Sequence, residues 1–151
     1  MASSSHVGMF DNVRCRYPLP HHQDAAFQTK NLARDSWLGG ALDDYEIMKD
    51  GRLRRRMHER KWIKKPASLL GGYFKSIRSW WEKLPDAHGD VFIYTSDGTP
   101  GEPRYQWIEF SVRFTNGRVQ DVRDVSRESR LKRKRRLVKR AAARNAKPPV
   151  E

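Results

Sequence analysis

The sequence contains one cysteine, Cys15, in 151 residues. An intramolecular disulfide is therefore excluded, and a secreted domain of this size would usually carry several cysteines. No run approaches the roughly 20 consecutive apolar residues that span a bilayer, and the N-terminus lacks the basic-then-apolar pattern of a signal peptide. These absences predict a cytoplasmic protein without a membrane span.

Acidic residues are also scarce, since 18 Asp and Glu stand against 31 Lys and Arg, giving a formal charge of +13. The excess is concentrated. Residues 126–151 hold eleven Lys or Arg against Glu128 and Glu151, and residues 52–65 hold eight against Glu59. Cations gathered in two segments act together on phosphates, because each one placed near a nucleic-acid backbone releases condensed counterions. A polyanionic partner is the expectation.

Motifs of catalysis and metal binding are missing as well. There is no Gly-rich phosphate loop, nucleophile elbow or set of paired metal ligands, so we expect no enzyme activity, no catalytic residues and no cofactor. Cys15, His21 and His22 lie close in sequence but match no zinc spacing. Cys15 is expected to be a small buried side chain on a strand, and His88, between two aspartates, to lie in a turn.

The length suits one domain with a real core, helped by 16 aromatic residues. We predict an α+β fold in which residues 9–125 form a mostly antiparallel sheet of five to seven strands in hairpins. Residues 1–8 are a flexible leader, and residues 126–151 are a basic C-terminal helix and tail. A twisted open sheet and a small barrel give the same sequence signals, so the sequence does not distinguish between the two.

Turn residues mark the hairpins. Asp50-Gly51 predicts a two-residue type I′ turn that places Met48 opposite Leu53 and Glu46 opposite Arg55. Asn116-Gly117 predicts a second tight turn. Short strands are expected at residues 13–17, 27–30, 45–49, 52–56, 91–95, 106–114 and 119–125.

The strand at residues 106–114 carries the clearest alternation. Ile108, Phe110, Val112 and Phe114 share one face, while Trp107 begins the opposite face. A period of two predicts that the first set is buried.

Two helices are expected. Residues 67–84 show apolar side chains at spacings of three and four, with Ser68 as a cap and Pro85 after the end, which predicts an amphipathic helix packed on one face of the sheet. Residues 126–146 are rich in good helix formers, with Ser126 as a cap and Pro148-Pro149 as a stop. The second helix has only a thin apolar stripe, which favours weak docking.

Both basic segments are candidate nucleic-acid-binding sites. In the middle segment, Trp62 and His58 interleave with cations, which suits base stacking beside phosphate contacts, although Trp62 is equally compatible with a core position. The tail is alternatively a solvated, solubilising segment. The candidate residues are Arg54, Arg55, Arg56, Arg60, Lys61, Trp62, Lys64, Lys65, Arg130, Lys132, Arg133, Lys134, Arg135, Arg136, Lys139 and Arg140.

The N-terminal third carries a family resemblance. GMFDNVRCRYPLP at residues 8–20, FQTK at 27–30 and YEIMKDGRL at 45–53 resemble small uncharacterised proteins of bacteria, phages and other mobile elements, with a looser likeness over residues 89–125. The resemblance implies a mobile-element setting and no activity, cofactor or site residues. Because the basic middle and tail depart from that pattern, the specialised function is expected there.

The expected function is sequence-tolerant binding of DNA or RNA by a small accessory protein, through phosphate contacts. The alternative is a protein-binding inhibitor or modulator of a host defence or replication component, acting through aromatic side chains near Trp80, Trp81 or Trp107. A structural or interaction protein is a second alternative. Neither a membrane nor a small-molecule substrate is expected as a partner.

Overall fold

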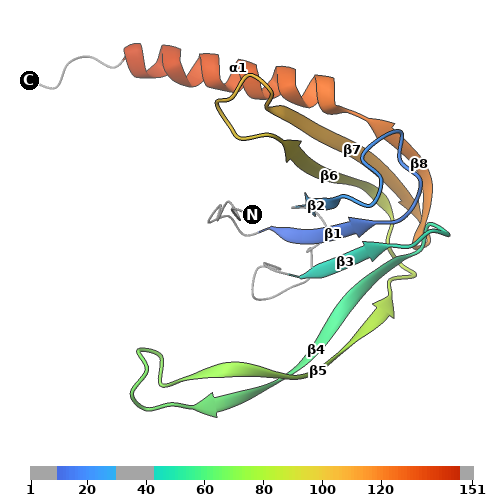
Figure 1. Cartoon of the computed structure of the whole chain (residues 1–151), viewed down its shortest axis with the longest axis vertical. Helices are drawn as coiled ribbons and strands as arrows, with labels where there is room; N and C mark the ends of the chain where they lie inside the picture. The colour runs from blue at the N-terminus through green and yellow to red at the C-terminus, as the bar shows by residue number, and fades with distance from the viewer. Residues whose placement is uncertain (1–9, 30–42, 147–151) are drawn as a thin grey trace, which may run out of the picture.

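The computed structural model describes residues 10–29 and 43–146 and shows one strongly curved sheet with a helix at one end (Figure 1). The eight strands follow the order β5-β4-β3-β1-β2-β6-β7-β8, and every neighbouring pair is antiparallel except β1 and β3. The predicted α+β class and mostly antiparallel sheet are confirmed, whereas five to seven strands was too few. The elements are β1 (Asp11–Cys15), β2 (Ala26–Thr29), β3 (Asp44–Ile47), β4 (Leu53–Lys64), β5 (Gly72–Lys83), β6 (Gly89–Asp97), β7 (Gln106–Thr115), β8 (Arg118–Asp124) and α1 (Ser126–Asn145).

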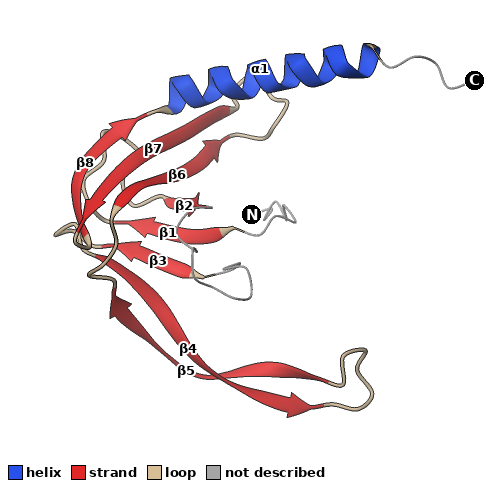
Figure 2. Ribbon diagram, turned by 180° about the vertical axis from the view of Figure 1, so that it is seen from behind, coloured by secondary structure: helices blue, strands red, loops and turns tan. Residues whose placement is uncertain are grey.

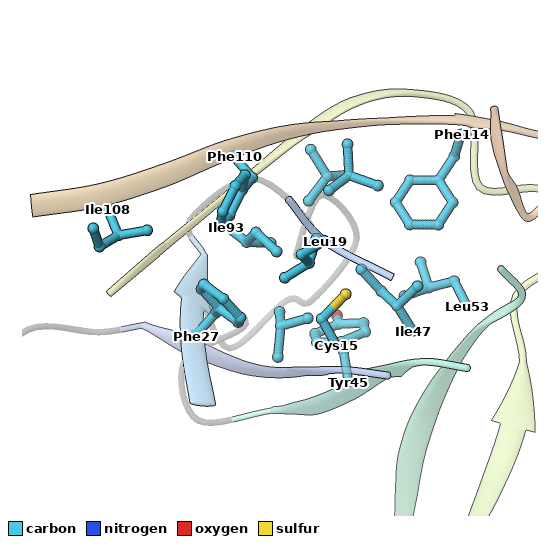
Figure 3. Packing of buried hydrophobic residues seen from close by; sticks show 13 residues of the cluster. Cys15, Leu19, Phe27, Tyr45, Ile47, Leu53, Ile93, Ile108, Phe110 and Phe114 are labelled. Atoms are coloured by element: carbon cyan, nitrogen blue, oxygen red, sulfur yellow. The ribbon is translucent and has the colours of Figure 1, made fainter. Parts of the chain in front are cut away.

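Curvature of the sheet creates the core. Strands β1 to β3 face β6 to β8 across a layer of apolar side chains, in which Phe27 meets Phe110 edge to face at 5.9 Å between ring centroids (Figures 2 and 3). The predicted alternation of β7 is confirmed, because all four of its inward residues are buried. Burial of each such side chain stabilises the fold by about 1.5–3 kcal/mol. Because the two halves of the curved sheet cover each other's inner face, this core forms without a packed helix.

The two halves of the sheet meet at a backbone junction. The Leu53 amide donates to the Gly117 carbonyl (3.0 Å), and the Leu53 carbonyl accepts from the Leu84 amide (2.9 Å). A further bond joins the Val119 amide to the Gly51 carbonyl (2.9 Å). The sheet is therefore open, with β5 and β8 as its ends, but it touches itself at this point.

The first predicted hairpin forms with a different register. Leu53 lies opposite Ile47 instead of the predicted Met48. Glu46 lies opposite Arg54 instead of the predicted Arg55. The loop has three residues rather than two, because the Met48 amide bonds the Arg52 carbonyl (2.8 Å) and Gly51 takes the left-handed conformation (φ 86°). A type I turn followed by a left-handed residue is the usual three-residue hairpin loop.

The prediction of an amphipathic helix over residues 67–84 is wrong. Residues 72–83 form β5, which pairs with β4 along nearly its whole length, and Ser68 lies in the connecting turn rather than at a helix cap. The three-and-four spacing misled because β5 is exposed along almost its whole length, so burial imposes no period of two on it. Aromatic and β-branched residues after Gly71-Gly72 suit a hairpin better than a helix.

The outer parts of β4 and β5 form a two-stranded ribbon that we call the arm, comprising residues 56–83. The last residue of β4 that pairs with β3 is Arg55, so the arm continues beyond the rest of the sheet. It extends from one end of the curved sheet, while α1 lies at the other end (Figure 1). Both project to the same side.

The predicted C-terminal helix is confirmed as α1. Ser126 does not cap it, because Val125 occupies the cap position and the Ser126 hydroxyl instead accepts from the Glu109 amide of β7 (2.9 Å). Pro148-Pro149, expected as the stop, and the expected leader at residues 1–8 lie outside the described residues.

Substitution of Gly117 tests how much the close backbone approach at the junction contributes to stability. Its φ is 75°, and an added Cβ would lie 2.4 Å from the Leu84 carbonyl oxygen, whereas Gly71 has nearly the same φ (73°) with nothing within 4 Å. We expect Gly71→Ala to lose at most about 1–2 kcal/mol of unfolding free energy from the left-handed backbone. Gly117→Ala should lose about 1–3 kcal/mol more from overpacking, measured by urea unfolding. Equal losses would show that the close approach at Gly117 carries no energy.

Candidate nucleic-acid interface

The first residues of α1, 126–133, which we call its root, are fixed to β7 by a small set of side chains. The Trp107 indole N–H donates to the Ser129 hydroxyl (3.1 Å), and the Arg133 guanidinium lies 3.8 Å above the Trp107 ring. Tyr94 also stacks on the Trp107 ring, with ring centroids 5.0 Å apart, which fixes the plane of the indole. The helix therefore leaves the sheet in a defined direction, although its apolar stripe is exposed.

The rest of α1 carries unpaired cations. A helix of 20 residues is about 30 Å long, and it holds ten Lys or Arg against Glu128 alone. Every described residue from Arg130 onward is exposed, and no ion pair within residues 10–29 and 43–146 involves α1. All eight candidate residues of the tail lie on this one element: Arg130, Lys132, Arg133, Lys134, Arg135, Arg136, Lys139 and Arg140.

The start of β4 is different, because its arginines are neutralised by the protein itself. Arg54 pairs with the buried Glu46 (2.8 Å), which also pairs with Arg16 (2.9 Å), and Arg55 pairs with Asp43 (2.6 Å). A buried carboxylate is costly unless it is paired, so these arginines are engaged in holding the sheet. Two of the candidate binding residues thus belong to the body of the fold.

The remaining candidates of the middle segment lie on the arm. Arg60, Trp62 and Lys64 alternate along β4 and share one face of the ribbon. Trp62 is 42% exposed, lies opposite Phe74 with ring centroids 4.9 Å apart, and covers Gly72, where a Cβ would meet its ring at 2.7 Å. Trp62 is therefore not a core residue. This face presents aromatic rings between two cations.

The opposite face of the arm repeats the mixture. Ile63 lies opposite Tyr73, and Lys61 lies directly opposite Lys75. Both lysines are exposed, and neither takes part in an ion pair within the described part of the chain. Like charges directly opposite each other destabilise a sheet pair, so the ribbon maintains a local positive potential at a cost in stability.

Sequence reasoning missed the contribution of β5. The arm surface also includes Tyr73, Phe74, Lys75 and Arg78 of β5. The sequence pattern predicted these residues to lie in a helix, which does not form. Eight of the twelve exposed large apolar residues in the described segments lie on the arm: Trp62, Leu69, Leu70, Tyr73, Phe74, Ile77, Trp80 and Trp81. The Gly71-Gly72 pair, which suits a turn between strands, was the available signal.

A second polar cluster lies between the β1–β2 loop and α1. The two imidazoles of His21 and His22 meet through their Nδ1 atoms, while His21 Nε2 contacts Asp124 (2.6 Å) and His22 Nε2 contacts Asp97 (2.7 Å). Asp124 also accepts from the Ser126 amide (2.9 Å). Burial raises the pKa of Asp124, but hydrogen bonds from Ser126 and His21 outweigh it and lower that pKa to about 2.

Neither this cluster nor Cys15 has the features of a metal site or a reactive centre in the part of the chain that the structure describes. No group of three or more His, Cys, Asp or Glu in the segments that the structure describes is arranged to hold a metal ion. Cys15 is buried at the end of β1, as predicted, and burial raises the pKa of its thiol to about 11. At neutral pH it is a thiol, which is a poor nucleophile.

Comparisons with protein families, curated proteins and solved structures gave no match for this chain. The likeness to mobile-element proteins therefore stays an expectation. None of the helices among the described residues is long and apolar enough to cross a membrane.

The Asp124 cluster predicts a pH dependence. Because the folded state holds the pKa of Asp124 below its ordinary value of 3.8, the charged carboxylate contributes stability above about pH 4 that is lost as the pH falls toward about 2. Asp124→Asn should lower the unfolding free energy at about pH 5, and the difference from the unsubstituted protein should shrink in acid.

Asp121→Asn is the matched control, since Asp121 is an exposed β8 aspartate 3.9 Å from Arg123. Urea unfolding at several pH values makes the measurement. A difference that stays constant from about pH 5 to about pH 2 would exclude a stabilising role for the ionised Asp124.

Proposed function

We propose that this protein binds DNA or RNA without base-sequence preference, with α1 as its main phosphate-binding element and the arm as a second contact. The observation that carries the proposal is the row of exposed cations on α1, which no carboxylate of the described residues neutralises. Such a row attracts a polyanion by releasing its counterions.

The placement of the two basic elements favours a polymer over a small anion. The arm and α1 lie at opposite ends of the curved sheet and project to the same side (Figures 1 and 2). One long polyanion can contact both, and the second contact then forms at high effective concentration. A single phosphate or nucleotide would reach only one.

The composition of the two elements supports sequence tolerance. The α1 cations surround most of the helix, leaving only a stripe that includes Leu131 and Val138, so they suit phosphates rather than a register of base edges. The arm adds aromatic rings, and every base offers a face on which such rings stack. Phosphate contact plus stacking requires no particular sequence.

A protein partner is the second candidate, favoured by the exposed aromatics of the arm. Trp80 and Trp81 are 36% and 39% exposed, whereas Trp107 is covered by the root of α1. An inhibitor of this kind would retain its partner after nuclease treatment and at high salt, and would depend on Trp80 and Trp81 more than on α1.

Charge removal on outer α1 tests the proposal. Changing Arg135, Arg136, Lys139 and Arg140 to Gln leaves the contacts of Trp107 with Ser129 and Arg133 intact. Each lost phosphate contact reduces the slope of log Kobs against log salt by about 0.9, so the slope for duplex DNA should fall by up to about 4. Fluorescence anisotropy across a salt series measures it.

The control variant changes Arg14, Arg104, Arg113 and Arg123 to Gln, which removes the same charge from exposed positions elsewhere. We expect the control to keep most of the slope. Equal effects of the two variants would mean that net charge alone drives binding, and no effect of the α1 variant would refute α1 as the phosphate-binding element.

The facing lysines of the arm give an independent test. Lys75→Glu replaces a repulsive pair with an attractive one, so the arm should gain about 0.2–1 kcal/mol, measured by amide hydrogen exchange in β4 and β5. The same change should weaken nucleic-acid binding and lower its salt slope by about 1, while Lys75→Gln gives intermediate effects. Unchanged affinity with a more stable arm would remove the arm from the interface.

A further inference from the structure

The end of the arm displays two adjacent leucines. Leu69 is fully exposed and Leu70 is 80% exposed, which makes them the most exposed large apolar residues in the described part of the chain. A single exposed leucine is ordinary on a protein surface. Two together at the end of a long ribbon form an apolar point that residues 10–29 and 43–146 leave exposed.

The turn that carries them is hydrogen-bonded rather than irregular. The Lys65 amide donates to the Gly71 carbonyl (3.0 Å), and the Gly71 amide donates to the Ser68 carbonyl (3.1 Å). The Ser68 amide and hydroxyl both donate to the Lys65 carbonyl, each at 2.9 Å. The turn therefore holds the two leucines together at its outer side.

Cations lie on both strands that lead to the leucines. Lys64 and Lys65 precede the turn and Lys75 follows it, and no acidic residue lies between Arg60 and Ile77. The nine residues of β4 beyond β3 reach about 30 Å, which is close to the roughly 34 Å of one duplex turn. The arm thus has the length and the charge to follow a groove with its end at the base stack.

The same features argue against the other partners that an apolar point can bind. Lysine is depleted in protein–protein interfaces, yet Lys64 and Lys65 adjoin this tip and Lys75 follows on β5, opposite Lys61. An element that lies in a membrane surface separates its apolar and cationic residues onto two faces. On the arm, Trp62 shares its face with Lys64 and Ile63 shares the other with Lys61, so neither face is apolar.

We propose that Leu69 and Leu70 form a wedge that enters between base steps of a duplex from the minor groove and kinks it, while Lys64, Lys65 and Lys75 contact the flanking phosphates. Apolar side chains inserted in this way unstack a step and bend DNA by about 20–90°. The inference rests on the proposed nucleic-acid binding and adds to it the form of nucleic acid and the deformation.

The test measures bending and binding on the same sample. The full-length protein is added to a duplex that carries donor and acceptor dyes at its ends, with either a central TA step, which kinks easily, or a stiff A-tract. We expect energy transfer to rise, and to rise more with the TA step. The variant Leu69→Ser with Leu70→Ser should bind within about threefold of the unsubstituted protein, because most affinity comes from phosphate contacts, but leave the duplex straight.

Leu137→Ser with Val138→Ser is the matched control, since it removes two exposed apolar residues from α1 (65% and 63% exposed). It should bend the duplex as the unsubstituted protein does. Equal bending by the tip variant would overturn the wedge.

The remaining outcomes separate the wedge from the proposed function. Salt-dependent binding by the unsubstituted protein without bending would overturn the wedge and leave nucleic-acid binding standing, whereas no binding at all would overturn both. Vesicles of phosphatidylserine and phosphatidylcholine provide the last arm of the experiment. Leucine-dependent vesicle binding with a straight duplex would assign the tip to a membrane surface and overturn the wedge.

Discussion

The backbone junction at Leu53 is the constraint on which the rest of the molecule depends. This buried residue joins two remote segments, because its amide bonds Gly117 and its carbonyl bonds Leu84. The junction keeps the halves of the sheet facing each other, so that Phe27 and Phe110 meet in one core (Figure 3). Strands that converge here diverge elsewhere, which leaves α1 and the arm at opposite ends.

The distribution of carboxylates explains why charge is balanced in the body and unbalanced at the ends. Glu46 and Asp43 lie where β4 joins the sheet, and they pair with Arg54 and Arg55 because these guanidinium groups are partly buried there. Desolvated charges need partners, whereas exposed cations on α1 are solvated and need none. The fold thus neutralises the arginines it holds internally and leaves the outer cations available.

Sequence predicted the parts of this fold whose side chains are sorted by burial. The alternation of β7 and the Asn116-Gly117 turn were correct because one face of β7 is buried, and α1 was correct because helix formers fill it. The arm was half missed, since neither face of β5 is covered and chance spacing imitated a helix. The cross-strand charge pair of Glu46 was predicted with Arg55 but forms with Arg54, because the three-residue loop that ends at the left-handed Gly51 shifts the register by one residue.

The arm receives little stabilisation from the rest of the fold, because β5 is exposed along almost its whole length. A two-stranded ribbon is marginally stable alone, and this one adds the facing Lys61 and Lys75 and an irregularity at Glu59/Arg60. Cross-strand contacts such as Trp62 with Phe74 and Arg78 with Glu59 offset part of that cost. None of these contacts buries the outer aromatics, which would gain most from a bound surface that also carries negative charge. Under the proposed nucleic-acid binding, a phosphate between Lys61 and Lys75 would recover the stability that these facing cations cost the isolated ribbon.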